Sequence, residues 1–178
     1  RSFSNPVEPA IPATRLAFAT VGQSSDASAD TAATLAIDNR ETTSSRTADL
    51  PGSHWWGHLS RIHRLQRVEG IQPAAPDDAL GRGCVLRLLR MDDQVVFEQD
   101  LPDVGPDGTW TIDLPAGVMA RTVWIGLPGD RTNGRGTRQV ALAEVRVSGM
   151  PDIPLGPPPP VTGTPLDRLV VSNNLASF

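Results

Sequence analysis

The chain has 178 residues, enough for one domain with a substantial core, and it carries a net charge of −4 with an isoelectric point near 5.3. This acidic balance argues against nucleic acid as a partner, and no apolar run approaches the length of a membrane span. All 16 cations are arginine, which suits bidentate contacts with carboxylates, while 16 glycines and 17 prolines predict many turns and few long helices.

The single cysteine, Cys84, excludes an internal disulfide. It lies in the apolar run Gly-Cys-Val-Leu-Arg-Leu-Leu, so we expect a buried strand thiol rather than a nucleophile. The chain begins at Arg1, with neither an initiator methionine nor a signal peptide, which predicts a processed form or a segment of a longer protein.

The first fifty residues contain little periodic structure. Residues 1–13 carry three prolines and predict an extended lead-in. Residues 16–20 form a short strand candidate, and the small polar residues of 21–34 predict a surface loop. Residues 35–40 form a brief apolar segment that leads into an Asp-Asn turn, and residues 42–51 are again polar and loop-like.

The segment 53–71 is the one around which the chain is organised, and it contains the adjacent Trp55 and Trp56. Adjacent side chains of a strand point to opposite faces, so one tryptophan can enter the core while the other covers a loop or an edge. The apolar positions that follow recur every third residue, which fits neither a regular strand nor a regular helix. We therefore predict a core strand with an irregular start. The segment also holds all three histidines, His54, His58 and His63, which share no metal-ligand spacing with cysteine or acidic residues and so predict surface or packing roles rather than a zinc site.

The second half of the chain predicts a series of short strands. Residues 85–90 and 95–101 flank the hairpin turn 91–94, and a second turn at 105–108 precedes alternating strands at 110–114 and 123–127. In the last strand, 139–148, the apolar positions change parity at Ala143–Glu144, which predicts a β-bulge. About eight such strands indicate an all-β protein, an antiparallel β-sandwich or jelly roll. Trp110 and Trp124 could stack on a sugar from the outer face, although packing is the commoner role of such residues.

Residues 150–178 differ in composition from the rest. The four consecutive prolines Pro157, Pro158, Pro159 and Pro160 predict a stiff polyproline segment, and Leu166 and Phe178 are among its flanking apolar residues. The segment could lie on the domain's own surface or in the groove of a partner, and the sequence favours neither. We predict that it is an arm that binds a neighbouring protein.

Several short motifs occur in the order in which the discoidin domains carry them. They are Leu16-Ala-Phe-Ala-Thr20, Leu35-Ala-Ile-Asp38, Thr43-Ser-Ser-Arg46, Trp55-Trp56 and the closing Leu142-Ala-Glu-Val-Arg-Val-Ser-Gly149. Residues 14–149 thus resemble the coagulation-factor C-type and F-type lectin group of galactose-binding-like jelly rolls. The predicted organisation is a lead-in over 1–13, this domain over 14–149 and a proline-rich arm or linker over 150–178.

The resemblance implies a non-catalytic fold that binds glycans, phospholipid head groups or proteins through loops at one end. It also implies a structural calcium ion. The ligands carried over by position are the carbonyls of Leu35 and Arg40, the carboxylate of Asp38, Ser44 or Ser45, the carbonyl of Ala143, and Glu144. A hard cation prefers oxygen ligands of this mixed kind, and it would hold two distant loops together.

The loops near 39–46, 76–83 and 129–138 are the expected ligand site. Its candidate residues are Arg46, Arg82, Arg131, Asn133 and Arg135. Fucose-binding members of the family carry a histidine where this chain has Thr47 or Ala48, and their spaced arginine pair has no counterpart, so the resemblance does not imply fucose recognition.

No hydrolase motif, phosphate-binding glycine loop or paired carboxylates are found, so we predict that the chain is not an enzyme. Two functions remain open. The chain is either a ligand-binding module of an extracytoplasmic protein, or a structural subunit of a larger extracytoplasmic complex that is held through its tails. Fold resemblance does not choose between them.

Overall fold

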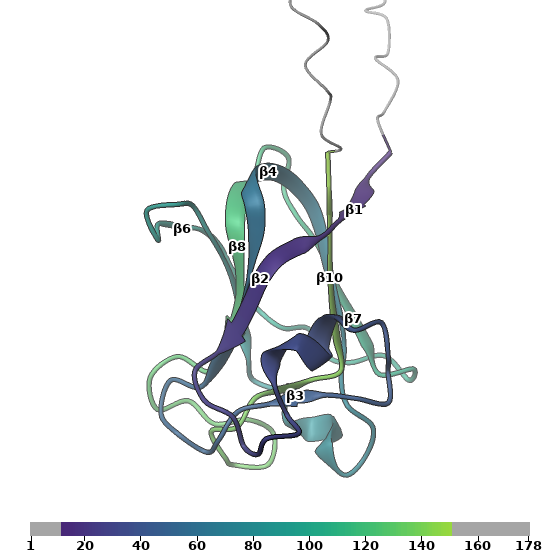
Figure 1. The fold of residues 1–178 in the computed structure, drawn as a ribbon, viewed down its shortest axis with the longest axis vertical. Coiled ribbons are helices and arrows are strands. Elements are labelled where there is room, and N and C mark those ends of the chain that lie inside the picture. Colours follow the sequence, from purple (N-terminus) through teal and green to yellow (C-terminus); the bar gives the residue numbers. More distant parts are fainter. Residues whose placement is uncertain (1–11, 151–178) are drawn as a thin grey trace, which may run out of the picture.

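The computed structural model describes residues 12–150, which form an almost entirely β structure (Figure 1). The predicted arm residues Pro157–Pro160, Leu166 and Phe178 lie outside the described residues. The strands are β1 (Thr14–Leu16), β2 (Phe18–Gln23), β3 (Ser45–Arg46), β4 (His54–Ile71), β5 (Val85–Leu89), β6 (Val95–Asp100), β7 (Thr109–Asp113), β8 (Met119–Gly126), β9 (Ala141–Leu142) and β10 (Glu144–Gly149). Two 3-10 helices, η1 (Ala33–Ile37) and η2 (Asp77–Ala79), lie in the loops.

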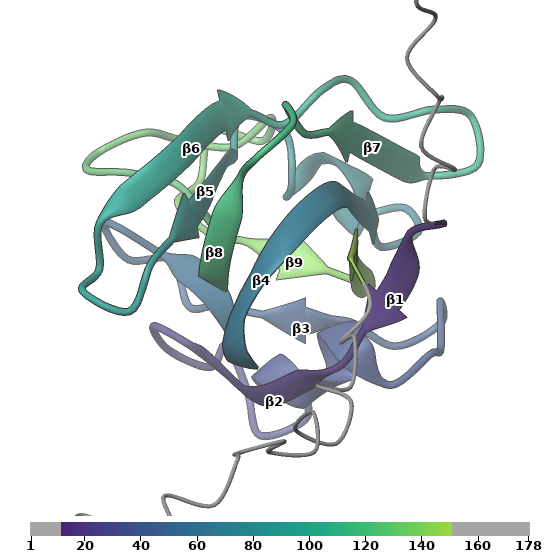
Figure 2. The ribbon, with the colours of Figure 1, turned by 90° about the horizontal axis from the view of Figure 1, so that it is seen from above.

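The strands form two antiparallel layers that share β4. The first half of β4 pairs with β2 and β8, and the sheet continues through β5 to the edge strand β6. The second half of β4 pairs with β7 on one side and with β10 on the other, and β1 completes that layer. This arrangement confirms the predicted all-β antiparallel sandwich (Figure 2).

Strand β4 is an arch that crosses from one layer to the other. It is 18 residues long, well beyond the usual strand length, and its pairing with β8 is interrupted between His58 and His63. Both of its ends therefore lie at the same end of the sandwich, while its middle crosses the opposite end (Figures 1 and 2). A register shift against β10 explains part of the irregular apolar spacing: Leu65 pairs with Gly149 and Arg67 with Ser148, so Gln66 is an extra residue, and Leu65 and Val68 both enter the core although their positions differ in parity.

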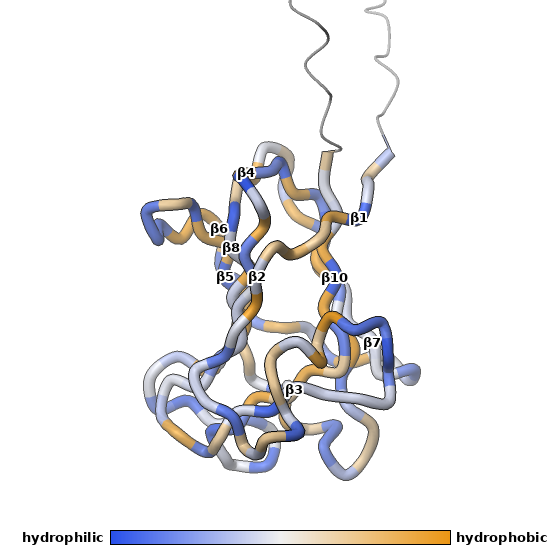
Figure 3. Tube along the Cα trace, in the orientation of Figure 1, coloured by the Kyte–Doolittle hydropathy of each residue, from blue (hydrophilic) through white to orange (hydrophobic). Residues whose placement is uncertain are grey.

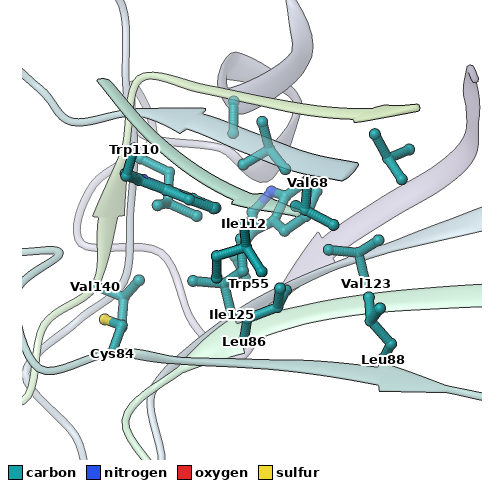
Figure 4. Close-up of a cluster of buried hydrophobic side chains, with 14 of the residues drawn as sticks. Trp55, Val68, Cys84, Leu86, Leu88, Trp110, Ile112, Val123, Ile125 and Val140 are labelled. Carbon is teal, nitrogen blue, oxygen red and sulfur yellow. The ribbon is translucent and has the colours of Figure 1, made fainter. Parts of the chain in front are cut away.

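The core lies between the two layers. Trp55, Leu86, Val123 and Ile125 come from one layer, and they face Trp110, Val68 and Ile112 from the other (Figure 4). Hydrophobic residues follow the strands, whereas hydrophilic residues gather in the turns (Figure 3). Trp55 is fully buried and its Nε1 donates a hydrogen bond to the Ala33 carbonyl at 3.0 Å, which fixes η1 against the sheet. Losing such a side chain typically costs about 3–5 kcal/mol.

Two large aromatic side chains lie over glycines of the neighbouring strand. Trp56 pairs in register with Gly22, and a Cβ added to Gly22 would lie 2.4 Å from its ring. Trp110 pairs in register with Gly70, and a Cβ added to Gly70 would lie 2.2 Å from the Trp110 ring. The glycines make room for the indoles, so any larger residue there would displace a tryptophan.

Most local expectations are confirmed. Trp55 is buried while Trp56 is half-exposed, and the turn at 91–94 joins β5 to β6. The β-bulge predicted at Ala143–Glu144 is wrong: the chain changes sheet there, because β9 pairs with β3 whereas β10 pairs with β4 and β1. The segment 35–40, expected to be a short anchor, contains the end of η1.

Cys84 provides a direct test of the core. It is fully buried, and this burial raises the pKa of its thiol to about 12. The folded protein should therefore not react with iodoacetamide at about pH 8, whereas the protein unfolded in guanidinium should take up one label. Rapid alkylation of the folded protein, followed by mass spectrometry, would contradict this packing.

Candidate functional site

The loops gather at the end of the sandwich where both ends of β4 lie. Strand β1 pairs with β10 through Thr14 and Gly149 at the opposite end. The two boundaries of the described chain thus lie together, away from η1, β3 and η2 (Figure 1). All five arginine and asparagine residues predicted to bind a ligand belong to the loop end.

Arg46 and Arg135 are brought together by an acidic residue that sequence reasoning did not single out. Asp77, at the start of η2, accepts a hydrogen bond from Arg46 Nη2 through Oδ2, and its Oδ1 lies 3.5 Å from Arg135 Nη1. The three side chains are half-buried or partly exposed. Both guanidinium groups are therefore engaged within the protein, and they link three loops to one another.

Arg131 and Asn133 also have internal partners. Arg131 Nη1 lies 2.5 Å from Asp100 Oδ1 and donates to the Gly83 carbonyl at 3.3 Å. Asn133 is buried, and its Nδ2 donates to Thr137 Oγ1 and to the Gln139 carbonyl at 2.8 and 2.7 Å. Its Oδ1 accepts from two backbone N–H groups of the same loop. Asn133 thus uses its hydrogen-bonding groups to shape the loop 133–139.

Arg82 differs from the other predicted arginines because it lines a cavity while its guanidinium has no partner among residues 12–150; Arg131 lines a separate cavity but is paired with Asp100. The cavity lined by Arg82 has a volume of about 410 Å³ and lies between the loop that follows β4, the turn 104–108 and Glu41. The two loops are joined at its base, where the Gln72 N–H donates to the Gly108 carbonyl at 2.8 Å. Gly108 has a φ of +79°, which favours glycine at this turn. A cavity of this size accommodates a small ligand.

The polar groups of the cavity are largely without partners. Among residues 12–150, the side chains of Glu41, Asp78 and Arg82 form no hydrogen bond or ion pair, and all three residues are exposed. Gln72 is only 4% exposed, and its buried Oε1 has no hydrogen-bond partner within the same part of the chain. Leaving a buried acceptor unpaired is costly, so this position favours a ligand or water that donates a hydrogen bond.

Asp107 contributes a further carboxylate to the cavity lining. Its pKa is lowered, chiefly because the Thr109 hydroxyl and the Thr109 N–H both donate to its Oδ1. The sequence had indicated only a turn at 105–108. The predicted loops 39–46 and 76–83 contain Glu41 and Asp78, although neither residue was singled out, and Gln72 lies outside the predicted loops.

The carboxylate of Asp38, predicted as a metal ligand, is engaged within its own turn. Its Oδ1 accepts from the Arg40 N–H at 2.9 Å and its Oδ2 accepts from Thr43 Oγ1 at 2.8 Å. The Thr43 hydroxyl also lies 3.0 Å from the Arg40 carbonyl, itself a predicted ligand. Leu35 belongs to η1, Ser44 lies directly before β3, and Ala143 separates β9 from β10.

Glu144, the other predicted carboxylate ligand, is fully buried and is surrounded by donors. Its Oε1 accepts from Arg15 Nη2 at 3.0 Å and lies 3.7 Å from Arg146 Nε, and its Oε2 accepts from the Asn39 N–H at 3.1 Å. Calcium requires roughly six to eight oxygen ligands around one point. Here guanidinium and amide N–H groups face the carboxylate instead, so these residues do not fit a calcium ion. Within residues 12–150, no three acidic, histidine or cysteine side chains form a metal-binding group.

The aromatic residues on the outer face of the first layer pack against their neighbours. Trp124 stacks with His54 at a centroid distance of 5.2 Å, and the Arg87 guanidinium lies 4.9 Å from its ring centroid. The ring centroid of Trp56 lies 4.4 Å from that of His58, whose pKa is lowered by burial and by nearby Arg121.

The third histidine, His63, is buried. Trp110 is also buried and cannot stack on a sugar from outside. The expected packing roles of His54 and His58 are thus confirmed.

Comparison with known proteins finds likeness in structure alone. No protein-family model and no curated protein matches the chain. A fucose binding module of Streptococcus pneumoniae is 18% identical with a TM-score of 0.65, over 78% of this chain and 96% of the module. The lectin domain of lectinolysin, solved with Lewis b antigen, is 21% identical with a TM-score of 0.62, over 72% and 90%. A chitosan-binding module from a Paenibacillus sp. IK-5 chitosanase/glucanase is 20% identical with a TM-score of 0.57, over 73% and 94%.

These solved structures are lectin domains and carbohydrate-binding modules, and they bear out the resemblance that the sequence motifs indicated. The chain therefore has the discoidin-like, galactose-binding-like jelly-roll fold that F-type lectins and carbohydrate-binding modules share.

Proposed function

We propose that the chain is a non-catalytic glycan-binding module whose ligand enters the cavity at the loop end. The observation that carries the proposal is the combination of Gln72 Oε1, a buried acceptor without a partner, with the unpaired side chains of Glu41, Asp78 and Arg82 around one cavity. Sugars present many hydroxyl groups, and such convergent polar groups fix a ligand's orientation.

The similar structures support this proposal because they are described as binding fucose, Lewis b antigen or chitosan. An extracytoplasmic location belongs to the same proposal, since soluble and surface glycans occur chiefly there. Across residues 12–150, no helix has the length and apolar character needed to span a membrane.

The alternative of a structural subunit has one observation in its favour. Thr14 pairs with Gly149, so the described chain begins and ends at the end opposite the cavity. A partner held there would leave the cavity accessible, and the two functions are therefore compatible.

Removal of residues 150–178 should leave the melting temperature nearly unchanged and abolish attachment to a partner. Unfolding of the truncated domain would contradict an arm that is independent of the core.

The proposed ligand site is tested with an array of immobilised glycans. Replacing Arg82 by alanine removes charge-assisted hydrogen bonds worth about 1.5–3 kcal/mol, so binding should weaken at least tenfold. Arg67→Ala is the matched control, because Arg67 pairs with Asp113 on the second layer at 2.7 Å and lies outside the cavity. Both variants should melt close to the unaltered protein.

Two results would contradict the proposal. The first is the failure of the folded protein to bind any glycan on the array. The second is binding that is reduced equally by Arg67→Ala and Arg82→Ala, which would place the ligand elsewhere.

A further inference from the structure

The cavity at the loop end is rich in acceptors and carboxylates. Glu41, Asp78 and Asp107 line it together with one cation, Arg82. The hydrogen bonds from Thr109 lower the pKa of Asp107 and so favour its charged form. The neutral Gln72 adds a further acceptor, because its Oε1 is buried and without a partner in residues 12–150.

This balance of charge favours one class of sugar. A ligand with an acidic group would meet three carboxylates for one guanidinium, whereas a protonated amine would meet three partners of opposite charge. An ammonium group also offers three hydrogen-bond donors and no acceptor, which complements Gln72 Oε1 and the unpaired carboxylates. Building on the proposed glycan-binding function, we propose that the cavity selects an amino sugar, a glycan built from deacetylated hexosamine, over its neutral or N-acetylated counterpart.

Each group has a definite place in this arrangement. Gln72 follows directly on β4, and its backbone N–H donates to the Gly108 carbonyl at 2.8 Å. Arg82 is positioned by the loop 133–136, because the side-chain stem of Arg82 packs against Gly134. Its guanidinium is free of other partners in the described chain and can donate to sugar hydroxyls while the carboxylates take the amine.

Calorimetry with a tetramer of β-1,4-linked glucosamine and with its fully N-acetylated form tests the selectivity. The glucosamine tetramer should bind about tenfold more tightly, and raising the pH above the pKa of the sugar amine should abolish the difference. Asp78→Asn and Glu41→Gln, which keep the size of the side chain, should each remove most of the preference. Added salt should reduce it as well.

A control is needed because the whole protein is acidic and attracts a cationic chain non-specifically. Asp92→Asn changes the net charge by the same amount, and Asp92 lies in the turn between β5 and β6, outside the cavity. This variant should keep the full preference for the glucosamine tetramer.

The outcomes separate the two proposals. Equal or tighter binding of the N-acetylated tetramer, still weakened by Arg82→Ala, would overturn the amino-sugar preference and leave the glycan-binding function intact. Equal effects of Asp92→Asn and Asp78→Asn would also overturn it, because the attraction would then be non-specific. No binding of either tetramer, together with no binding on the glycan array, would overturn both.

A second inference rests on the independent cluster around Glu144. The side chain of Glu144 is 0% exposed, and Arg15 from β1 donates to the oxygen that also lies nearest Arg146. The Asn39 N–H, from the turn after η1, donates to the other oxygen. We infer that Arg15 supplies the positive charge that a calcium ion supplies in the resembling family, so that Glu144 joins the 38–40 turn to β10 without a metal.

Without the Arg15 guanidinium, the buried Glu144 carboxylate would keep only the Asn39 N–H and the more distant Arg146 beside it. A buried charge that loses its partner is strongly destabilising. Arg15→Ala should therefore lower the melting temperature by roughly 10 °C, even though Arg15 is half-exposed, while Arg67→Ala at an exposed ion pair should change it by about 2 °C or less. Calcium and chelator should leave the melting curve of the unaltered protein unchanged.

A double-mutant cycle separates pairing from general damage. Arg15→Ala and Glu144→Gln should be strongly non-additive, because either change removes the same ion pair. Additive effects, or a melting temperature of the unaltered protein that rises with calcium and falls with chelator, would overturn the inference.

Discussion

The arch of β4 is the constraint on which the rest of the structure depends. One continuous strand supplies the centre of both layers, so the two sheets cannot separate without breaking its pairing to β2, β8, β7 and β10. Its inward side chains, with Trp55 at one end and Val68 towards the other, anchor the core between the layers. Because both ends of the arch emerge on the same side, the loops that continue from it are gathered there.

This geometry separates two ends of the sandwich: the end where the described chain begins and ends, beside β1 and β10, and the loop end that carries the cavity. Strands β1 and β10 close the second layer where the arch crosses, and the described chain begins and ends there. At the other end, ion pairs hold the loops in fixed positions, as Asp77 does for Arg46 and Arg135. The groups around the cavity have no partners in the described chain, and a rigid frame around a few free polar groups is what a selective binding site requires.

The sequence was a good guide to local structure and a poor guide to the site. Alternation and turn residues predicted the β5–β6 hairpin and the opposite fates of Trp55 and Trp56, because these depend on near neighbours. The arch was harder to predict, since a register shift against β10 breaks its two-residue period. Arginines in loops were chosen by residue type, but the partner of Arg46 lies 31 residues away. Gln72, which is central to the cavity, belongs to no motif, and only tertiary structure reveals its unpaired oxygen.

The most direct test of the central claim, that the loop-end cavity is the sugar site, is a nuclear magnetic resonance titration of nitrogen-15-labelled protein with the glucosamine tetramer. The account predicts that the backbone amides of residues 71–82 and 104–108 shift in a saturable way, while those of β6 and of the turn between β5 and β6 do not. Saturable shifts confined to the outer face around Trp56 and Trp124, or no shifts at all, would contradict it.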